Sequence, residues 1–374
     1  MKIRVGSRIA AATACAMGAL VLASPASAQK IENSYICVFK QGAVAKGATS
    51  RKANEIARAN GGEVRHVYSN TIRGFAANMP AHAAQRVAAN NPNIAFCEQD
   101  QVMQTIQRGK KPGGGGGGST GPAQTTPWGI TRVNGGTTTG SGYAIVIDTG
   151  VDLDHADLNV NASLSRSFTR EKNADDGNGH GTHVAGTMAA KDNDIGVVGV
   201  SPGSTVVAIK VLTRSGSGSN SGVIAGVDYA ATVPGRSNNV ANMSLGGGFS
   251  QALNDAVVSA ASQGLRFALA AGNESTSATT KSPASANGAN IYTISAFAEG
   301  DTWASFSNYG NPPVDYAEPG VAIFSTYKDG GYATLSGTSM ASPHAAGLLL
   351  LGAIRGDGTV RGDPDGNADT IGVR

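Results

Sequence analysis

The chain has 374 residues, of which 40% are hydrophobic and 15% charged, and its formal net charge at pH 7 is +3. This length accommodates one sizeable globular domain and a small second one. The positive charge is small and dispersed, which argues against nucleic acid as a partner. The 52 glycines predict many tight turns and close backbone approaches.

The first 28 residues have the three-part pattern of a secretory signal. Basic residues between Lys2 and Arg8 precede an apolar run at residues 9–23, and Ala-Ser-Ala at 26–28 forms a small-residue cleavage site. A membrane anchor is the alternative, but the run is shorter than the roughly 20 residues that span a bilayer. We therefore expect a secreted protein, extracellular or periplasmic, with no membrane association after signal removal.

Residues 29–103 are expected to form a small α+β unit. The predicted elements alternate as βαββαβ, with strands at 35–39, 63–68, 74–79 and 94–98 and helices at 52–60 and 81–90. This order is that of the ferredoxin-like fold, and an unrelated small domain is the alternative. In a ferredoxin-like sheet the first and last strands are neighbours. Because disulfides persist in exported proteins, we predict a bridge between Cys37 and Cys97.

Residues 104–123 are expected to be a linker. Their central part, residues 113–118, is an uninterrupted run of glycine, which cannot bury apolar surface and predicts a flexible coil. A phosphate-binding loop would need a strand before it and a helix with a lysine after it. We therefore interpret this segment as a protease-accessible tether.

Residues 124–354 have the pattern of an α/β domain. Near-continuous apolar runs at 143–147, 206–212, 240–245 and 266–271 predict strands, and helices are expected at 184–190, 220–231 and 251–263. Such strands separated by helices predict a mostly parallel sheet with helices on both faces. Sites in these sheets gather at the carboxyl ends of strands, where Asp148 lies. Residues 355–374 form a Gly/Asp-rich tail without a helical period, either flexible or marking a shortened domain edge.

Three motifs supply, in chain order, an Asp, a His and a Ser. They are Val-Ile-Asp-Thr-Gly at 146–150, Gly-His-Gly-Thr-His-Val-Ala-Gly at 179–186 and Ser-Gly-Thr-Ser-Met-Ala-Ser-Pro-His at 336–344. A serine nucleophile needs a histidine base, and the histidine needs a carboxylate that fixes its tautomer. The order Asp, His, Ser is that of subtilisin-type proteases. The flanking residues resemble that family, and within it the proteinase K-like branch, over nearly the whole chain.

The resemblance implies a role for each of four residues: Ser339 as nucleophile, His180 as general base, Asp148 as its orienting carboxylate and Asn273 as an oxyanion donor. Simpler alternatives exist, since Ser is a common helix N-cap and Asn a common turn residue. His183 follows His180 at helical spacing. A zinc protease of that type would carry His-Glu-x-x-His, so we expect a packing role for His183.

The resemblance also implies a substrate pocket. Its S1 walls are expected from two short segments, namely Ser244, Leu245 and Gly246 on one side and Ala270, Ala271 and Gly272 on the other. Small, apolar walls leave room for large apolar P1 side chains with broad specificity. Glu274 suggests tolerance for a basic P1 residue, or is simply a solvated surface group.

Metal expectations follow from the resemblance too. No cofactor is expected for catalysis. Asp315 matches a calcium-binding position of the family, where carbonyls of residues 282–290 would complete the six to eight oxygen ligands of a structural Ca²⁺. Asp175 and Asp176 form either a second cluster or a solvated turn.

The sequence therefore predicts a monomeric, secreted serine endopeptidase that acts on proteins and peptides. The resemblance implies that the 29–103 unit assists folding and then occupies the active site as an inhibitor. Self-cleavage is expected to produce a fragment that begins between Gln104 and Thr125. Two alternatives are a catalytically inactive peptide-binding module and an esterase or peptide ligase. The intact triad disfavours the first, and an extended-peptide cleft disfavours the second.

Overall fold

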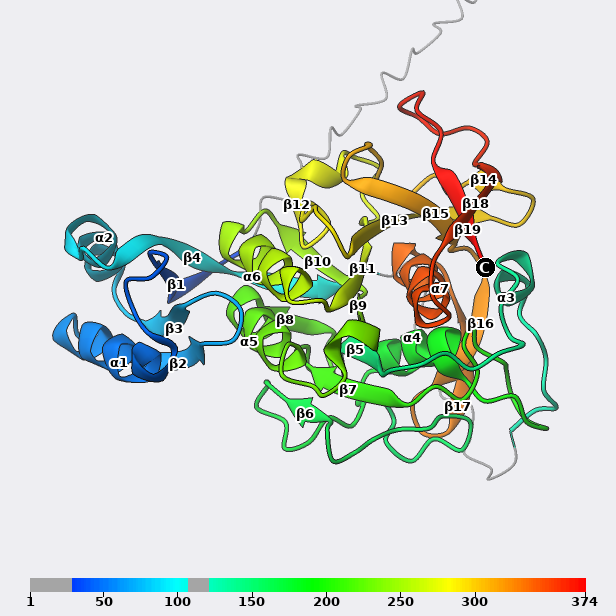
Figure 1. Cartoon of the computed structure of the whole chain (residues 1–374), viewed down its shortest axis with the longest axis horizontal. Helices are drawn as coiled ribbons and strands as arrows, with labels where there is room; N and C mark the ends of the chain where they lie inside the picture. The colour runs from blue at the N-terminus through cyan, green and yellow to red at the C-terminus, as the bar shows by residue number, and fades with distance from the viewer. Residues whose placement is uncertain (1–28, 107–120) are drawn as a thin grey trace, which may run out of the picture.

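The computed structural model describes residues 29–106 and 121–374. The expected signal segment and the glycine run lie outside the described residues. Figure 1 shows a small N-terminal unit, coloured blue to cyan, beside helices α5 (Asn220–Ala230) and α6 (Gln251–Ser262) of a larger unit. None of the described helices is long and apolar enough to cross a membrane.

The N-terminal unit has the expected βαββαβ order. Its elements are β1 (Lys30–Phe39), η1 (Lys46–Ala48), α1 (Thr49–Ala59), β2 (Glu63–Tyr68), β3 (Gly74–Asn78), α2 (Ala81–Asn90) and β4 (Ile94–Thr105). The antiparallel strands follow the order β4-β1-β3-β2, which is the ferredoxin-like arrangement.

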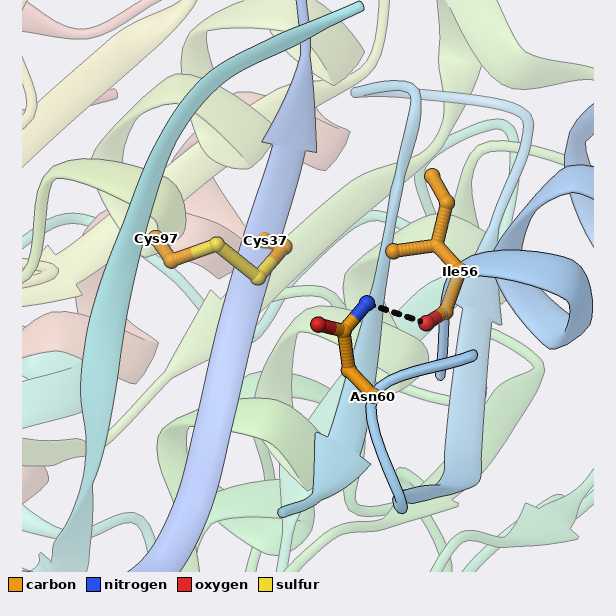
Figure 2. Close-up of a disulfide and its surroundings, with 4 residues drawn as sticks. All are labelled: Cys37, Ile56, Asn60 and Cys97. Carbon is orange, nitrogen blue, oxygen red and sulfur yellow. Dashed lines mark hydrogen bonds between the residues drawn. A yellow bond between two sulfur atoms is a disulfide. The ribbon is translucent and has the colours of Figure 1, made fainter. Parts of the chain in front are cut away.

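The predicted disulfide is confirmed. Cys37 and Cys97 are directly opposite in the β1–β4 register and are bonded through their sulfurs. Figure 2 shows the bridge joining the two neighbouring strands, with the end of α1 nearby, where the Asn60 side chain donates to the Ile56 carbonyl.

The larger unit is built on the expected mostly parallel sheet. Its strands follow the order β18-β19-β15-β13-β11-β9-β5-β7-β6, in which all neighbouring pairs are parallel except β18–β19. The bounds are β5 (Ala144–Asp148), β6 (Arg166–Ser167), β7 (Val206–Lys210), β9 (Val240–Met243), β11 (Arg266–Ala270), β13 (Ile291–Ala298), β15 (Val314–Pro319), β18 (Arg355–Thr359) and β19 (Thr370–Val373).

Helices cover both faces of this sheet. Successive strand residues point to opposite faces, and in β5 Ile145 and Ile147 join the core under α5 and α6, whereas Ala144 and Val146 join the core under α4 and α7. The remaining elements are α3 (Trp128–Arg132), α4 (His180–Ala189), β8 (Ser217–Ser219), η2 (Arg236–Asn238), β10 (Leu245–Gly248), η3 (Ala278–Thr280), β12 (Lys281–Ser282), β14 (Thr302–Trp303), β16 (Ile323–Tyr327), β17 (Gly331–Leu335) and α7 (Thr338–Leu350).

Two boundaries differ from the sequence-based expectation. The last strand of the N-terminal unit runs on to Thr105 rather than ending at Glu98, so Gln104 and Thr105 belong to a strand and not to the linker. The strand is longer because tertiary contacts extend it: the end of β4 pairs with β8 and β10 of the larger unit. The Gly/Asp-rich tail contributes β18 and β19, and β19 pairs with β15 at the sheet edge.

Candidate active site

The Asp and His of the motifs meet in the interior. Asp148 is the last residue of β5 and His180 the first residue of α4, and both side chains are fully buried. His180 Nδ1 lies 2.8 Å from Asp148 Oδ1, which also accepts from the Thr149 backbone N–H at 2.6 Å. Since a carboxylate oxygen accepts, Nδ1 carries the proton and Nε2 is left as the basic nitrogen.

Ser339 is the second residue of α7, at the positive end of the helix dipole. Its Oγ donates to the Ser244 carbonyl at 3.0 Å, while the Ser244 hydroxyl donates to the Ser339 carbonyl at 2.8 Å. In the described part of the chain, no group hydrogen bonds with His180 Nε2, which is buried. Attack by Ser339 on a substrate would begin with a turn of its hydroxyl from the Ser244 carbonyl to this nitrogen.

Asn273 lies shortly after β11, beside the start of α7. Its Oδ1 accepts from both the backbone N–H and the hydroxyl of Thr338, at 2.9 and 3.0 Å. The Thr338 hydroxyl in turn accepts from the Gly272 N–H at 3.1 Å. These bonds fix the orientation of the Asn273 amide next to the residue that follows Thr338, namely Ser339.

The end of β4 occupies a groove between β8 and β10. Gln104 pairs with Gly246 on one side and Ser217 on the other, and Thr105 pairs with Leu245. The Thr105 N–H donates to the Gly216 carbonyl at 3.0 Å. The chain therefore lies as an added strand between two strands of the larger unit, which is the β-augmentation mode of peptide binding. The sequence-based reading missed this segment, because its polar residues carry no apolar alternation.

Ile106 is the last described residue of this segment and approaches Ser339. Its N–H donates to the Ser244 carbonyl at 3.4 Å, the same carbonyl that accepts from Ser339 Oγ. A Cβ on Gly246 would lie only 2.7 Å from Ile106 Cδ1, so the absence of a side chain at Gly246 makes room for the isoleucine. Four of the expected wall residues are fully buried, namely Ser244, Leu245, Ala270 and Ala271.

Gly272, the last of the expected wall residues, has a positive φ of 112°, and a Cβ there would clash with Asn308 Nδ2. The carboxylate of Glu274, the suggested site for a basic P1 residue, is engaged by two protein groups. It accepts from Asn308 Nδ2 at 2.7 Å and lies 3.3 Å from Lys281 Nζ.

The expected metal ligands differ in their surroundings. Asp315 Oδ2 accepts from the Thr293 N–H at 2.8 Å, and partial burial raises the pKa of Asp315 to about 6. Asp175 is exposed, whereas Asp176 is buried, so the solvated-turn reading is wrong for Asp176. Across residues 29–106 and 121–374, no group of three or more His, Cys, Asp or Glu side chains is arranged to hold a metal ion.

His183 is fully buried and serves packing within α4 and its neighbours. Its Nε2 contacts the carbonyls of Ile323 and Ala333 at 3.0 and 3.1 Å, and burial, with the nearby His180 as a lesser cause, lowers the pKa of His183 to about 3. The imidazole therefore stays neutral and donates from Nε2 to β16 and β17.

Comparison with known proteins agrees with this fold and geometry. Residues 140–353 match the model of the Subtilase family. The chain is 37% identical to Subtilisin-like protease 1 of Arthroderma otae, over 91% of this chain and 71% of that protein. It is 38% identical to Subtilisin-like protease 7 of Trichophyton violaceum, over 93% and 89% of the two chains.

A crystal structure of a cold adapted subtilisin-like serine proteinase superposes with a TM-score of 0.59 at 38% identity, covering 65% of this chain and 96% of the other. The fold is therefore shared with a solved proteinase, and the sequence match extends over most of the chain. The protein belongs to the subtilase family and is a serine endopeptidase that acts on protein substrates.

Proposed function

We propose that the protein is made as a self-inhibited precursor that cleaves its own chain between Ile106 and Gln107. The observation that carries this proposal is the segment from Met103 to Ile106, which consists of the end of β4 and the residue after it and lies in the groove between β8 and β10. Each residue from 104 to 106 is held through its backbone there, and the last of them bonds to the carbonyl beside the nucleophile.

The chemistry assigns a role to each residue of the triad. Ser339 Oγ attacks the Ile106 carbonyl carbon while its proton passes to His180 Nε2, and Asp148 stabilises the imidazolium that forms. The oxyanion of the tetrahedral intermediate accepts hydrogen bonds from Asn273 Nδ2 and the Ser339 N–H. When the intermediate collapses, the C–N bond breaks and His180 donates the proton to the new amine of Gln107. Water then releases the acyl group from Ser339 by the same steps.

We further propose that the site prefers large apolar P1 residues. Ile106 is itself apolar, and it packs against Gly246 where no side chain intervenes. The proposed S1 walls are Ser244, Leu245, Gly246, Ala270, Ala271 and Gly272. The backbone pairing along β8 and β10 is independent of side-chain identity, which favours broad specificity elsewhere in the peptide.

After cleavage, the N-terminal unit stays bound as an inhibitor because its contacts extend beyond the groove. Glu98 accepts from the Ser250 hydroxyl and from the backbone N–H groups of Gln251 and Ala252, at the start of α6. Asp100 accepts from the N–H and hydroxyl of Ser221, at the start of α5. Carboxylates at helix N-termini are stabilised by the helix dipole.

The proposal also covers the export and maturation of the chain. The first 28 residues direct secretion of a monomeric precursor. The cut after Ile106 then separates residues 29–106 from the rest of the chain, which consists of residues 107–123, the 124–354 catalytic domain and its 355–374 tail. A structural Ca²⁺ at Asp315 is proposed on the chemistry of its carboxylate, which would be joined by backbone carbonyls of residues 282–290.

The test compares the wild-type precursor with Ser339→Ala, His180→Ala and His183→Ala, each made without added protease. Intact mass and N-terminal sequencing should find a fragment that begins at Gln107 in the wild type and an uncut chain in the Ser339 and His180 variants. His183→Ala, the matched control, should still be cut but unfold at a lower temperature. Cutting of Ser339→Ala as efficient as that of the wild type would refute self-cleavage, and a different wild-type N-terminus would refute the site.

A further inference from the structure

A buried carboxylate outside the triad motifs is hydrogen-bonded to the residues that adjoin Asp148 and His180, namely Thr149 and Gly179. Asp176 belongs to the loop before α4 and is 4% exposed. Burial raises the pKa of Asp176, and hydrogen bonds, led by that from the Gly179 N–H, oppose the rise. Among the described residues Asp176 forms no salt bridge, and five hydrogen bonds stabilise its charge, with a weaker electrostatic contribution from Lys328.

Four of these bonds hold the start of the helix that carries His180. Asp176 Oδ1 accepts from the N–H groups of Asn178 and Gly179, both at 2.9 Å, and Oδ2 accepts from the Thr182 N–H at 2.9 Å and hydroxyl at 2.7 Å. The N-cap residue Gly179 has no side chain to satisfy the first helical N–H groups. Asp176 supplies the missing cap from outside the helix.

The fifth bond leads to Asp148. The Thr149 hydroxyl donates to Asp176 Oδ1 at 2.9 Å and accepts from the Gly181 N–H at 2.9 Å, while the Thr149 N–H donates to Asp148 Oδ1. Lys210, fully buried beside Glu171, donates to the Thr149 carbonyl. Thr149 therefore couples the end of β5 to the start of α4 through a single carboxylate.

We propose that Asp176 is a positioning residue for the catalytic pair, fixing the distance between the Asp148 carboxylate and the His180 ring. It touches neither substrate nor the reacting atoms and acts through Thr149 and the α4 backbone. The proposal rests on the proposed roles of Asp148 and His180. An asparagine at this position would turn an N–H₂ group toward a backbone N–H donor in either amide orientation, so at least one of the bonds from the backbone would be lost.

The test measures kcat, KM and the pH dependence of kcat/KM on a peptide amide for Asp176→Asn and for Asp175→Asn, a matched change of charge at the exposed neighbour. Rates are expressed per active site, titrated with a serine-directed phosphonate. We expect Asp176→Asn to lower kcat about 30- to 100-fold with KM within about twofold. Asp175→Asn should match the wild type.

The acid limb of the pH profile of kcat/KM distinguishes a positioning role of Asp176 from a role in stability alone. Four other titratable groups face the pair or Asp176. They are His183 on α4, Tyr327 at the end of β16, Lys328 directly after it and Lys210 on β7, which donates to the Thr149 carbonyl. If Asp176→Asn misaligns Asp148, the imidazolium of His180 loses support and the acid limb moves to lower pH by about half a unit. A purely structural residue would change only the number of titrated sites.

Thr149→Val and Thr149→Ser keep the proposal testable if Asp176→Asn does not fold. Serine preserves the bridging hydroxyl and should stay within about threefold of the wild type, whereas the isosteric valine should lower kcat about tenfold or more. Unchanged kcat and acid limb in both Asp176→Asn and Thr149→Val would overturn the positioning role. His180→Ala tells the two proposals apart, because an active His180→Ala enzyme would instead refute the triad assignment.

Discussion

The two units of the chain solve the same stability problem by different means. The larger unit has two extensive apolar clusters, one on each face of its sheet, and the described part of it contains no cysteine. The first cluster also includes residues of the N-terminal unit, namely Ile36, Val38, Tyr68, Ile72 and Ala76. The N-terminal unit has one smaller cluster, in which Cys37 is buried and bonded to Cys97. A domain of fewer than about 80 residues buries too little apolar surface for a large margin of stability, so a covalent cross-link is more valuable to the small unit.

The boundary between the units differs again from either interior. Asp228 of α5 accepts five hydrogen bonds from residues 69–71 of the small unit, three from backbone N–H groups and two from side chains. Together with Glu98 and Asp100, it gives an interface in which carboxylates from both sides meet hydrogen-bond donors. Such charge-assisted bonds are directional, so this interface favours one docking geometry, the one that leads β4 into the groove.

Two matched phenylalanines offer the largest test of this contrast. Phe267 in β11 and Phe75 in β3 are both fully buried, and each lies in the core of its own unit. Truncation to alanine should cost about 3–5 kcal/mol of the unfolding free energy of the affected unit. Denaturant unfolding of the uncut Ser339→Ala precursor should therefore show the loss in the larger unit for Phe267→Ala and in the small unit for Phe75→Ala.

The unfolding of the mature enzyme, which lacks the small unit, distinguishes the two variants further. Enzyme matured from the Phe75→Ala precursor should unfold like the wild type, because residue 75 leaves with the small unit. A mature Phe75→Ala enzyme that unfolds at a lower temperature would show that the folding route leaves a lasting effect on the larger unit.

The disulfide gives the second test. The cross-link spans 60 residues of sequence, and its removal should lower the unfolding free energy of the small unit by about 2–4 kcal/mol. A Cys37→Ser/Cys97→Ser double variant in the Ser339→Ala background should unfold its N-terminal unit at lower denaturant, and a reductant should have the same effect on the unchanged precursor. The mature enzyme serves as the control, and a reductant should not change its unfolding transition. Equal transitions with and without the bridge would contradict its stabilising role.

Much of this architecture could be predicted from sequence, because strong local patterns agreed with the tertiary fold. The strands of both units followed apolar runs, and the opposition of Cys37 and Cys97 followed from the strand order. The motifs around Asp148, His180 and Ser339 pointed to the candidate site through short, family-specific sequences. The helix predicted from residue 184 begins at His180, since its cap comes from Asp176 rather than from an adjacent N-cap side chain.

Other features depended on contacts that the sequence does not encode locally. The second half of β4 is a strand because the larger unit supplies its partners, which no alternation within residues 99–105 indicates. Asp176 has the sequence context of a solvated turn, and only the arrangement of donors around it reveals a buried cap. In both cases a polar segment is ordered by hydrogen bonds from elements distant in sequence.

Glu318 offers the finest test, because it contrasts with the well-satisfied carboxylates of the interface. It lies in β15, fully buried, and neither side-chain oxygen has a hydrogen-bond partner among the described residues. Burial raises the pKa of Glu318 well above its ordinary value, with Arg132 opposing only in part. Folding therefore favours the neutral form of this carboxyl, whereas in the unfolded chain it ionises at its ordinary pKa of 4.5.

The sign of the pH dependence follows from that difference. The raised pKa costs no stability below about pH 4, and the penalty grows as the pH rises from there toward the folded-state pKa. Glu318→Gln replaces the acid with a group of the same shape that cannot ionise, so the stabilisation of the mature enzyme by this change should increase as the pH rises from 5 to 7. Thermal unfolding of an inhibited enzyme at pH 5, 6 and 7 measures this, with Glu299→Gln at an exposed site as control. A gain that is equal at all three pH values would mean that the carboxyl is not held neutral, and that this interior group is compensated as fully as Asp228 is at the interface.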